Sequence, residues 1–151
     1  MGGDNNYWGA STWKFIHTLI EKIKEEDYVE LGPQIFGWLK NICYNLPCPD
    51  CTQHATRFIN NVNVSTIVSK QDLKNVFYLF HNIVNVRKKK PQFKYEDLEI
   101  YKKYSLPIVY SEFVKNFHTK GNMNLISESY RRDRMLRSMQ QWFIKNGHRL
   151  N

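Results

Sequence analysis

Leu46-Pro47-Cys48-Pro49-Asp50-Cys51 contains two of the three cysteines and two of the five prolines of this chain. Pro47 predicts the end of one helix, because the residue before a proline avoids helical geometry. Pro49 predicts the start of the next helix, since a proline loses no hydrogen bond in the first helical turn. Cys48 then lies at a helix N-terminus and Cys51 one turn inside. The partial positive charge of that terminus favours thiolate over thiol, so the pair is a candidate reactive group.

Spacing alone leaves three interpretations of this cysteine pair open. In the first, Cys48 exchanges with a substrate thiol and Cys51 passes the electrons on. In the second, Cys43, Cys48, Cys51 and His54 form a Cys3His zinc site without catalysis, although Cys43 lies inside the preceding helix. In the third, the thiols are small buried core residues. A thioredoxin-type fold is disfavoured, because a helix rather than a strand precedes the pair.

The composition restricts the class of protein. With 151 residues, 42% hydrophobic and 15% aromatic, the chain can form a core as one domain or as a small domain with an appendage. A net charge of +8 leaves nucleic acid or an anionic membrane surface open as partners. No apolar run approaches the roughly 20 residues of a membrane helix. The N-terminus has no signal-peptide pattern, so we expect no classical secretion and no transmembrane segment.

Helical periodicity dominates the chain and predicts an all-α fold. The expected helices of the first part cover residues 13–23, 33–44, 49–59, 69–89 and 95–104. Two more helices are expected over residues 108–118 and 125–150. We therefore predict a four-helix bundle with a short fifth helix in residues 7–106, followed by a basic helical extension in residues 107–151.

Two of these helices carry polar residues beside an apolar face. Trp13 and His17 are four residues apart and share a face, a pattern that is usually explained by core packing. His81, Asn82 and Asn85 follow the apolar face of the helix over 69–89. Histidine and asparagine are costly to bury without hydrogen bonds, which indicates a polar ligand against this helix. The cations that follow, at positions 87–90, suit the helix C-terminus and would suit a pyrophosphate.

Three motifs combine these residues in one order over residues 8–104. They are Trp8-Gly9-x3-Trp13-x3-His17, Leu46-Pro47-Cys48-Pro49-Asp50-Cys51-x2-His54-Ala55 and His81-Asn82-x-Val84-Asn85-x-Arg87-x2-Lys90-Pro91. As a set, they resemble the Erv/ALR family of FAD-linked sulfhydryl oxidases. The form Leu-Pro-Cys-x-x-Cys-x-x-His-Ala is most similar to the versions carried by large cytoplasmic DNA viruses.

This resemblance implies a helical bundle that binds FAD non-covalently and converts dithiol and oxygen to disulfide and hydrogen peroxide. By match, Cys51 would be the thiolate in charge-transfer contact with the flavin, and Cys48 the outward sulfur that substrate thiols attack. Trp13 and His81 would pack against the adenine. The remaining residues that would line the FAD are Gly9, Ser11, Thr12, His17, Asn82, Val84, Asn85, Arg87, Lys90 and Tyr95. This interpretation includes no metal site.

The resemblance also implies partners and a location. Cellular members usually carry a second, shuttle disulfide in a flexible tail, which this chain lacks. A thiol-containing protein substrate or a thioredoxin-like relay protein is therefore expected to reach Cys48 directly, and Cys43 is expected to be a reduced core residue. Family members usually form homodimers, so we expect a homodimer. A viral member would act in the host cytoplasm, the virus factory or the virion.

The extension holds most of the remaining positive charge. Arginines at positions 131, 132, 134 and 137 would suit nucleic acid or membrane headgroups, but they do not form one stripe. Met135, Met139, Trp142 and Phe143 form a competing apolar face. We therefore expect packing on the bundle or dimerisation rather than contact with nucleic acid or membrane.

Overall fold

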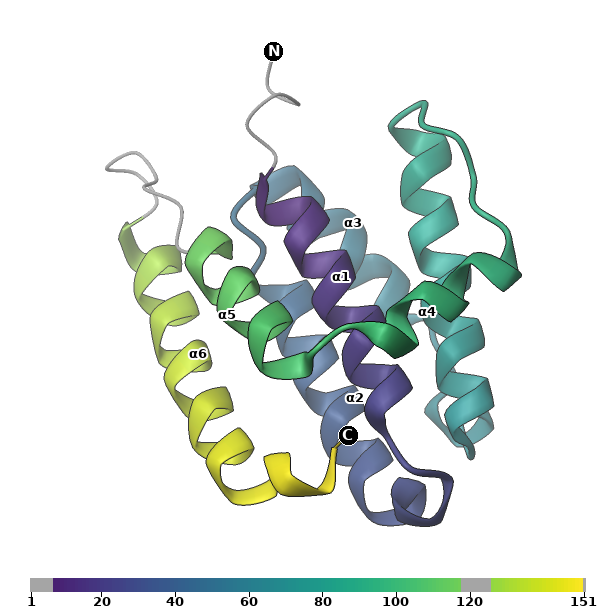
Figure 1. The fold of residues 1–151 in the computed structure, drawn as a ribbon. Coiled ribbons are helices and arrows are strands. Elements are labelled where there is room, and N and C mark those ends of the chain that lie inside the picture. Colours follow the sequence, from purple (N-terminus) through teal and green to yellow (C-terminus); the bar gives the residue numbers. More distant parts are fainter. Residues whose placement is uncertain (1–6, 118–125, 151) are drawn as a thin grey trace.

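The computed structural model describes residues 7–117 and 126–150, and all regular structure in these ranges is helical (Figure 1). The α-helices are α1 (Tyr7–Lys22), α2 (Tyr28–Tyr44), α3 (Pro49–Asn60), α4 (Lys70–Arg87), α5 (Leu106–Phe117) and α6 (Ile126–Asn146). Four 3₁₀ helices join or follow them: η2 (Glu25–Asp27), η3 (Val64–Thr66), η4 (Tyr95–Lys103) and η6 (Gly147–Arg149). The predicted all-α class is confirmed.

Helix α1 lies at the centre of the molecule. It contacts α5, η4 and α4, whereas α2 packs on α3 and α4. Figure 1 shows η4 crossing over α1 as the chain returns from α4 to α5. The first four α-helices and η4 form the predicted bundle with its short fifth helix.

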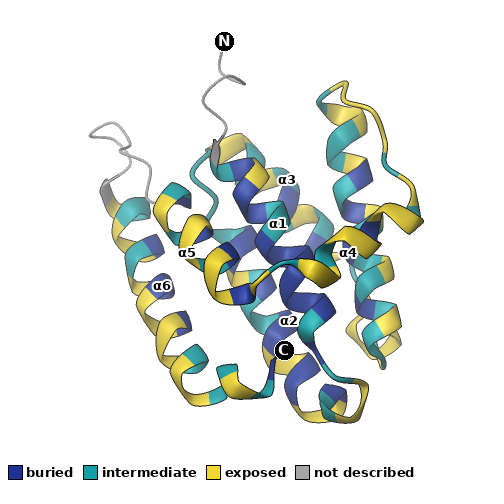
Figure 2. Cartoon of the chain, viewed as in Figure 1, coloured by how far each residue is buried: buried dark blue, intermediate teal, exposed yellow. Residues whose placement is uncertain are grey.

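The core follows the helical spacing of the apolar residues (Figure 2). On α1, Ile16, Ile20 and Ile23 recur every three or four residues and are all buried, as the sequence predicts. Ile35 and Leu39 do the same on α2. Burying each such side chain contributes about 1.5–3 kcal/mol, so this packing rather than local helix propensity holds the bundle together.

The extension packs on the bundle and shares its core. Phe113 and Phe117 of α5 and Met139 of α6 are fully buried in the same hydrophobic cluster as α1 and α2. Helix α5 begins at Leu106, next to the predicted domain boundary between residues 106 and 107. That boundary stays a prediction, and apolar packing continues across it. The expected packing of the extension on the bundle is confirmed.

Polar contacts hold the end of the chain on α2. The indole Nε1 of Trp142 donates to Oε1 of Gln34 at 2.8 Å. Nη2 of Arg149 lies 2.9 Å from carboxylate oxygens of both Asp27 and Glu30, at the start of α2. Helices α6 and η6 are therefore attached to the start of α2 by side-chain contacts, whereas Phe143 of α6 packs on Phe15 of α1 and Tyr110 of α5.

Helix α2 begins five residues earlier than the sequence pattern predicts, and Pro33 lies inside it. A proline in a helix interior removes one backbone hydrogen bond and is normally avoided. Here Tyr28 and Leu31 are buried, and that burial extends the helix toward the N-terminus. The Tyr28 ring occupies the space beside Gly32, where an added Cβ would lie 2.5 Å from Cζ of the ring.

Across residues 7–117 and 126–150, none of the helices combines the length and the apolar character that spanning a bilayer requires.

Candidate functional site

Cys48 and Cys51 are joined by a disulfide, with their Cα atoms 5.2 Å apart. Cys48 is the N-cap of α3 and Pro49 is its first residue, as the sequence predicts. The backbone N–H of Cys51 donates to Sγ of Cys48 at 3.2 Å. The hydroxyl of Thr52 donates to the carbonyl oxygens of Leu46 and Cys48, at 3.1 and 3.0 Å. These bonds fix the loop that presents the disulfide.

The third cysteine takes no part in this arrangement. Cys43 is a free, buried thiol on α2. Burial raises the pKa of Cys43 to about 12, which keeps it protonated. Within the described parts of the chain, no three His, Cys, Asp or Glu side chains are grouped so as to hold a metal ion. The zinc alternative is therefore not supported, because two of its four ligands, Cys48 and Cys51, are bonded to each other.

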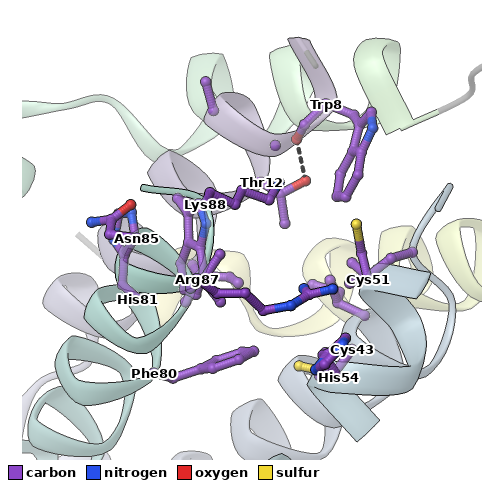
Figure 3. A pocket seen from close by; sticks show the side chains of 18 of the residues that line it. Trp8, Thr12, Cys43, Cys51, His54, Phe80, His81, Asn85, Arg87 and Lys88 are labelled. Atoms are coloured by element: carbon purple, nitrogen blue, oxygen red, sulfur yellow. Dashed lines mark hydrogen bonds between the residues drawn. The ribbon is translucent and has the colours of Figure 1, made fainter. Parts of the chain in front are cut away.

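A pocket of about 430 Å³ adjoins the disulfide, between α1, α3 and α4 (Figure 3). Its volume is typical of small-molecule sites. The predicted site residues on its wall are Gly9, Thr12, Trp13, Cys51, His81, Val84, Asn85, Arg87 and Lys90. Cys51 lines this pocket and Cys48 does not, and the separate roles predicted for the two sulfurs stay predictions.

Eleven further residues line this pocket, and the sequence analysis did not assign them to the FAD site. They are Trp8, Ala10, Ile16, Ile42, Cys43, Leu46, His54, Ala55, Phe80, Lys88 and Tyr101. Trp8, Leu46, His54 and Ala55 belong to the quoted motifs, so motif membership could have identified them. Tyr101 reaches the pocket because η4 crosses α1, and no local sequence pattern indicates that crossing.

Four predicted cofactor residues lie away from the pocket wall: Ser11, His17, Asn82 and Tyr95. The hydroxyl of Ser11 donates to the Trp8 carbonyl, and Tyr95 bonds with Gln71 on the side of α4.

Asn82 joins α4 to the chain that follows it. Its side chain makes two bonds of 3.0 Å, to the N–H and the carbonyl of Phe93. It thereby closes the turn between α4 and η4. The predicted contacts of these four residues with FAD stay untested.

An aromatic stack forms one wall of the pocket. The rings of Trp13 and His81 are nearly parallel, with centroids 4.0 Å apart. Behind them, Nε2 of His17 lies 2.9 Å from Nδ1 of His81. Burial lowers the pKa of His17 to about 3, with the neighbouring His81 adding to the effect. Burial and the charge of Lys90 lower the pKa of His81 to about 4, so both imidazoles are neutral at pH 7.

Positive charge gathers where α4 ends. Lys89 has a φ of 58°, and its N–H and that of Lys90 bond to the carbonyls of Val86 and Asn85 at 3.0 and 2.8 Å. This pattern is a Schellman cap, which turns the chain back and brings Lys90 to the pocket. Lys88 lies over the Trp8 ring, with Nζ 5.9 Å from its centroid.

Arg87 links the two helices that flank the pocket. Figure 3 shows its side chain extending from α4 toward Cys51. Its Nη2 pairs with the carboxylate of Asp50, in the first turn of α3. The pocket thus combines a disulfide, a neutral aromatic platform and three cationic side chains. These features fit a cofactor with planar rings and phosphates, as FAD has, placed next to the disulfide.

Comparison with known proteins gives the family that the three sequence motifs resemble. The family model described as Erv1/Alr family matches residues 10–105. The chain is 27% identical over 108 residues to the putative FAD-linked sulfhydryl oxidase 096R of Invertebrate iridescent virus 3, covering 71% of this chain and 72% of that protein. It is 34% identical over 82 residues to the probable FAD-linked sulfhydryl oxidase FPV093 of Fowlpox virus, covering 54% and 79%. No solved structure matches.

Proposed function

The chain belongs to the Erv1/Alr family, and we propose that it is an FAD-linked sulfhydryl oxidase that converts pairs of protein thiols into disulfides. One observation carries this function: the Cys48–Cys51 disulfide places Cys51 on the wall of a cofactor-sized pocket. The names of the viral relatives, which are FAD-linked sulfhydryl oxidases, support it.

The residues of the pocket fit FAD. The stacked rings of Trp13 and His81 offer a flat surface for a planar ring system. Arg87, Lys88 and Lys90 offer cations for its phosphates. When bound, FAD supplies a two-electron acceptor that oxygen reoxidises with release of hydrogen peroxide.

The cysteine pair performs the thiol exchange. A substrate thiolate attacks Sγ of Cys48, the Cys48–Cys51 bond breaks, and its electron pair leaves with Cys51 as a thiolate. A second substrate thiolate then attacks the substrate sulfur of the mixed disulfide. Cys48 leaves as a thiolate, and the substrate carries the new disulfide. Two electrons have moved from the substrate to the enzyme pair.

The local structure favours these steps. Cys48 is half-buried and lies outside the pocket wall, so a protein thiol does not have to enter the cofactor site. The N-terminus of α3 and the N–H of Cys51 stabilise negative charge on its sulfur. The carboxylate of Asp50 destabilises a negative charge on this sulfur. Its ion pair with Arg87 weakens that repulsion.

We also propose the partners and the location. A thiol-containing protein substrate or a thioredoxin-like relay protein would react at Cys48, and the chain would act as a homodimer. The similar proteins come from iridescent viruses and poxviruses. Their sources favour the host cytoplasm, the virus factory or the virion as the place of action.

A flavin and oxygen assay tests the function. The purified protein should show flavin absorbance and consume oxygen when dithiothreitol is added. Cys51→Ser should lower the turnover at least about 1,000-fold, because no intramolecular disulfide can form. Its flavin content should stay near that of the wild type and serves as the control for folding. Colourless protein that stays inactive after addition of FAD would contradict the proposal.

A further inference from the structure

A second, smaller cavity of about 180 Å³ lies against the same cysteine loop. Its residues from the loop and the flanking helices are Tyr44, Asn45, Leu46, Pro47, Pro49 and Thr52, and α6 adds Glu128, Arg131 and Arg132. Pro47 and Pro49 are the two neighbours of Cys48. By helical spacing, Thr52 and Cys51 occupy different faces of α3, so this cavity and the cofactor pocket meet the loop from different sides.

Arg132 is the unusual residue of this cavity. It is only 2% exposed, and its Nη2 has no hydrogen-bond partner within the described part of the chain. Glu128, one turn earlier on α6, accepts a hydrogen bond from the Ser127 hydroxyl at 3.1 Å. Burial lowers the pKa of Arg132, with Glu128 opposing the effect. Removing a guanidinium from water without a paired anion is strongly unfavourable.

Apolar residues further along α6 anchor the helix that carries Arg132. Met135, Leu136 and Met139, which follow Arg132 by three, four and seven residues, are all buried. The side-chain amide of Asn45, which also lines the cavity, lies 3.9 Å from the sulfur of Met135. The packed helix therefore places Arg132 at the cavity before any ligand arrives, and such preorganisation favours binding.

The cavity carries a net positive charge, because Arg131 and Arg132 outweigh Glu128. A guanidinium and a carboxylate match in geometry and form strong, charge-assisted hydrogen bonds. We propose that this cavity binds an acidic side chain of the thiol substrate protein, next to the cysteine that reacts with Cys48. This inference rests on the proposed function and adds a preference for acidic substrates. The arginines responsible lie on α6, outside the family match at residues 10–105.

Two short dithiol peptides test the preference. They have the same sequence except that one carries Glu, and the other Gln, before the first cysteine. The wild type should oxidise the Glu peptide with a kcat/KM about tenfold higher, since a charged hydrogen bond is worth about that factor. Arg132→Met should abolish this difference. Arg134→Met removes an exposed charge from the same helix and should keep it.

Dithiothreitol separates this inference from the proposed function. Both methionine variants should oxidise this uncharged dithiol as fast as the wild type does. A wild type that fails to oxidise dithiothreitol would refute the oxidase function itself. A normal dithiothreitol rate with equal rates on the two peptides, or a preference that survives in Arg132→Met, would overturn only the acidic-substrate site.

Thermal unfolding gives an independent result. Arg132→Met should melt at or above the temperature of the wild type, because a buried cation whose Nη2 has no hydrogen-bond partner among the described residues is replaced by an apolar side chain. A melting temperature well below that of the wild type would make Arg132 a structural residue and would also overturn the proposal.

Discussion

The two cavities that meet at the cysteine loop differ in where their walls come from and in how their charges are balanced. The larger one lies between α1, α3 and α4. The stacked His81 on its wall and His17 behind it are neutral, and Arg87 is paired with Asp50. The smaller one takes part of its wall from α6, including Arg132, whose Nη2 has no hydrogen-bond partner among the described residues. Residues of the family motifs line the larger cavity. The cations of the smaller cavity, Arg131 and Arg132, come from α6, which lies beyond those motifs.

Acid should affect the larger cavity most. His17 and His81 have pKa values of about 3 and about 4, below the ordinary 6.5. The unfolded chain therefore binds more protons than the folded chain between about pH 6.5 and pH 4. Their contribution to stability is complete above pH 6.5 and is lost as the pH falls toward 4. At pH 5 the loss should reach about 2 kcal/mol per histidine, measured by urea unfolding.

A variant isolates this effect from the titration of carboxylates. His17→Gln keeps a donor for Nδ1 of His81 but removes one ionisable ring. Its stability should fall less steeply between pH 6.5 and pH 5. Equal slopes for the wild type and His17→Gln would contradict the neutral histidine pair.

Loosening α6 should affect the smaller cavity and spare the larger one. Trp142→Ala removes the hydrogen bond from α6 to Gln34 of α2 and the ring contact of Trp142 with Phe143. The free energy of unfolding should fall by about 2 kcal/mol. Flavin content should stay unchanged, because Trp142 does not line the cofactor pocket. Loss of flavin from this variant would show that the two cavities are not separate units.

The smallest effect is expected at the end of α4. Lys89 has a φ of 58°, a conformation that favours glycine over residues with a Cβ. Lys89→Gly relieves this strain but makes the unfolded chain more flexible, so the net gain should be about 0.5 kcal/mol. Chemical unfolding measures it, and unchanged FAD affinity is the control. A clear loss of stability would show that the Lys89 side chain makes a contact that outweighs the strain.

Sequence patterns within single helices predicted many of the residues at the larger cavity. Pro49 and Cys48 mark the start of α3 by rules that involve only neighbouring residues. The spacing of His81, Val84 and Asn85 places them on one side of α4, and all three line the pocket. These positions depend on one helix at a time, so periodicity was sufficient to find them.

The remaining features depend on contacts between distant segments. Pro33 lies within α2 because Tyr28 and Leu31 are buried by other elements, which no local rule indicates. Tyr101 joins the pocket only after η4 crosses α1. Arg132 looked like one surface arginine among four, but in the fold it is buried and lines a cavity with residues of the cysteine loop.

The buried thiol of Cys43 has a further consequence for the durability of the enzyme. Its sulfur lines the pocket next to which the proposed reaction releases hydrogen peroxide. Peroxide oxidises thiolates rather than thiols. Burial raises the pKa of Cys43 to about 12, so its sulfur stays a thiol at pH 7. The protein therefore keeps its third cysteine in the protonated form, which reacts more slowly with peroxide than a thiolate does.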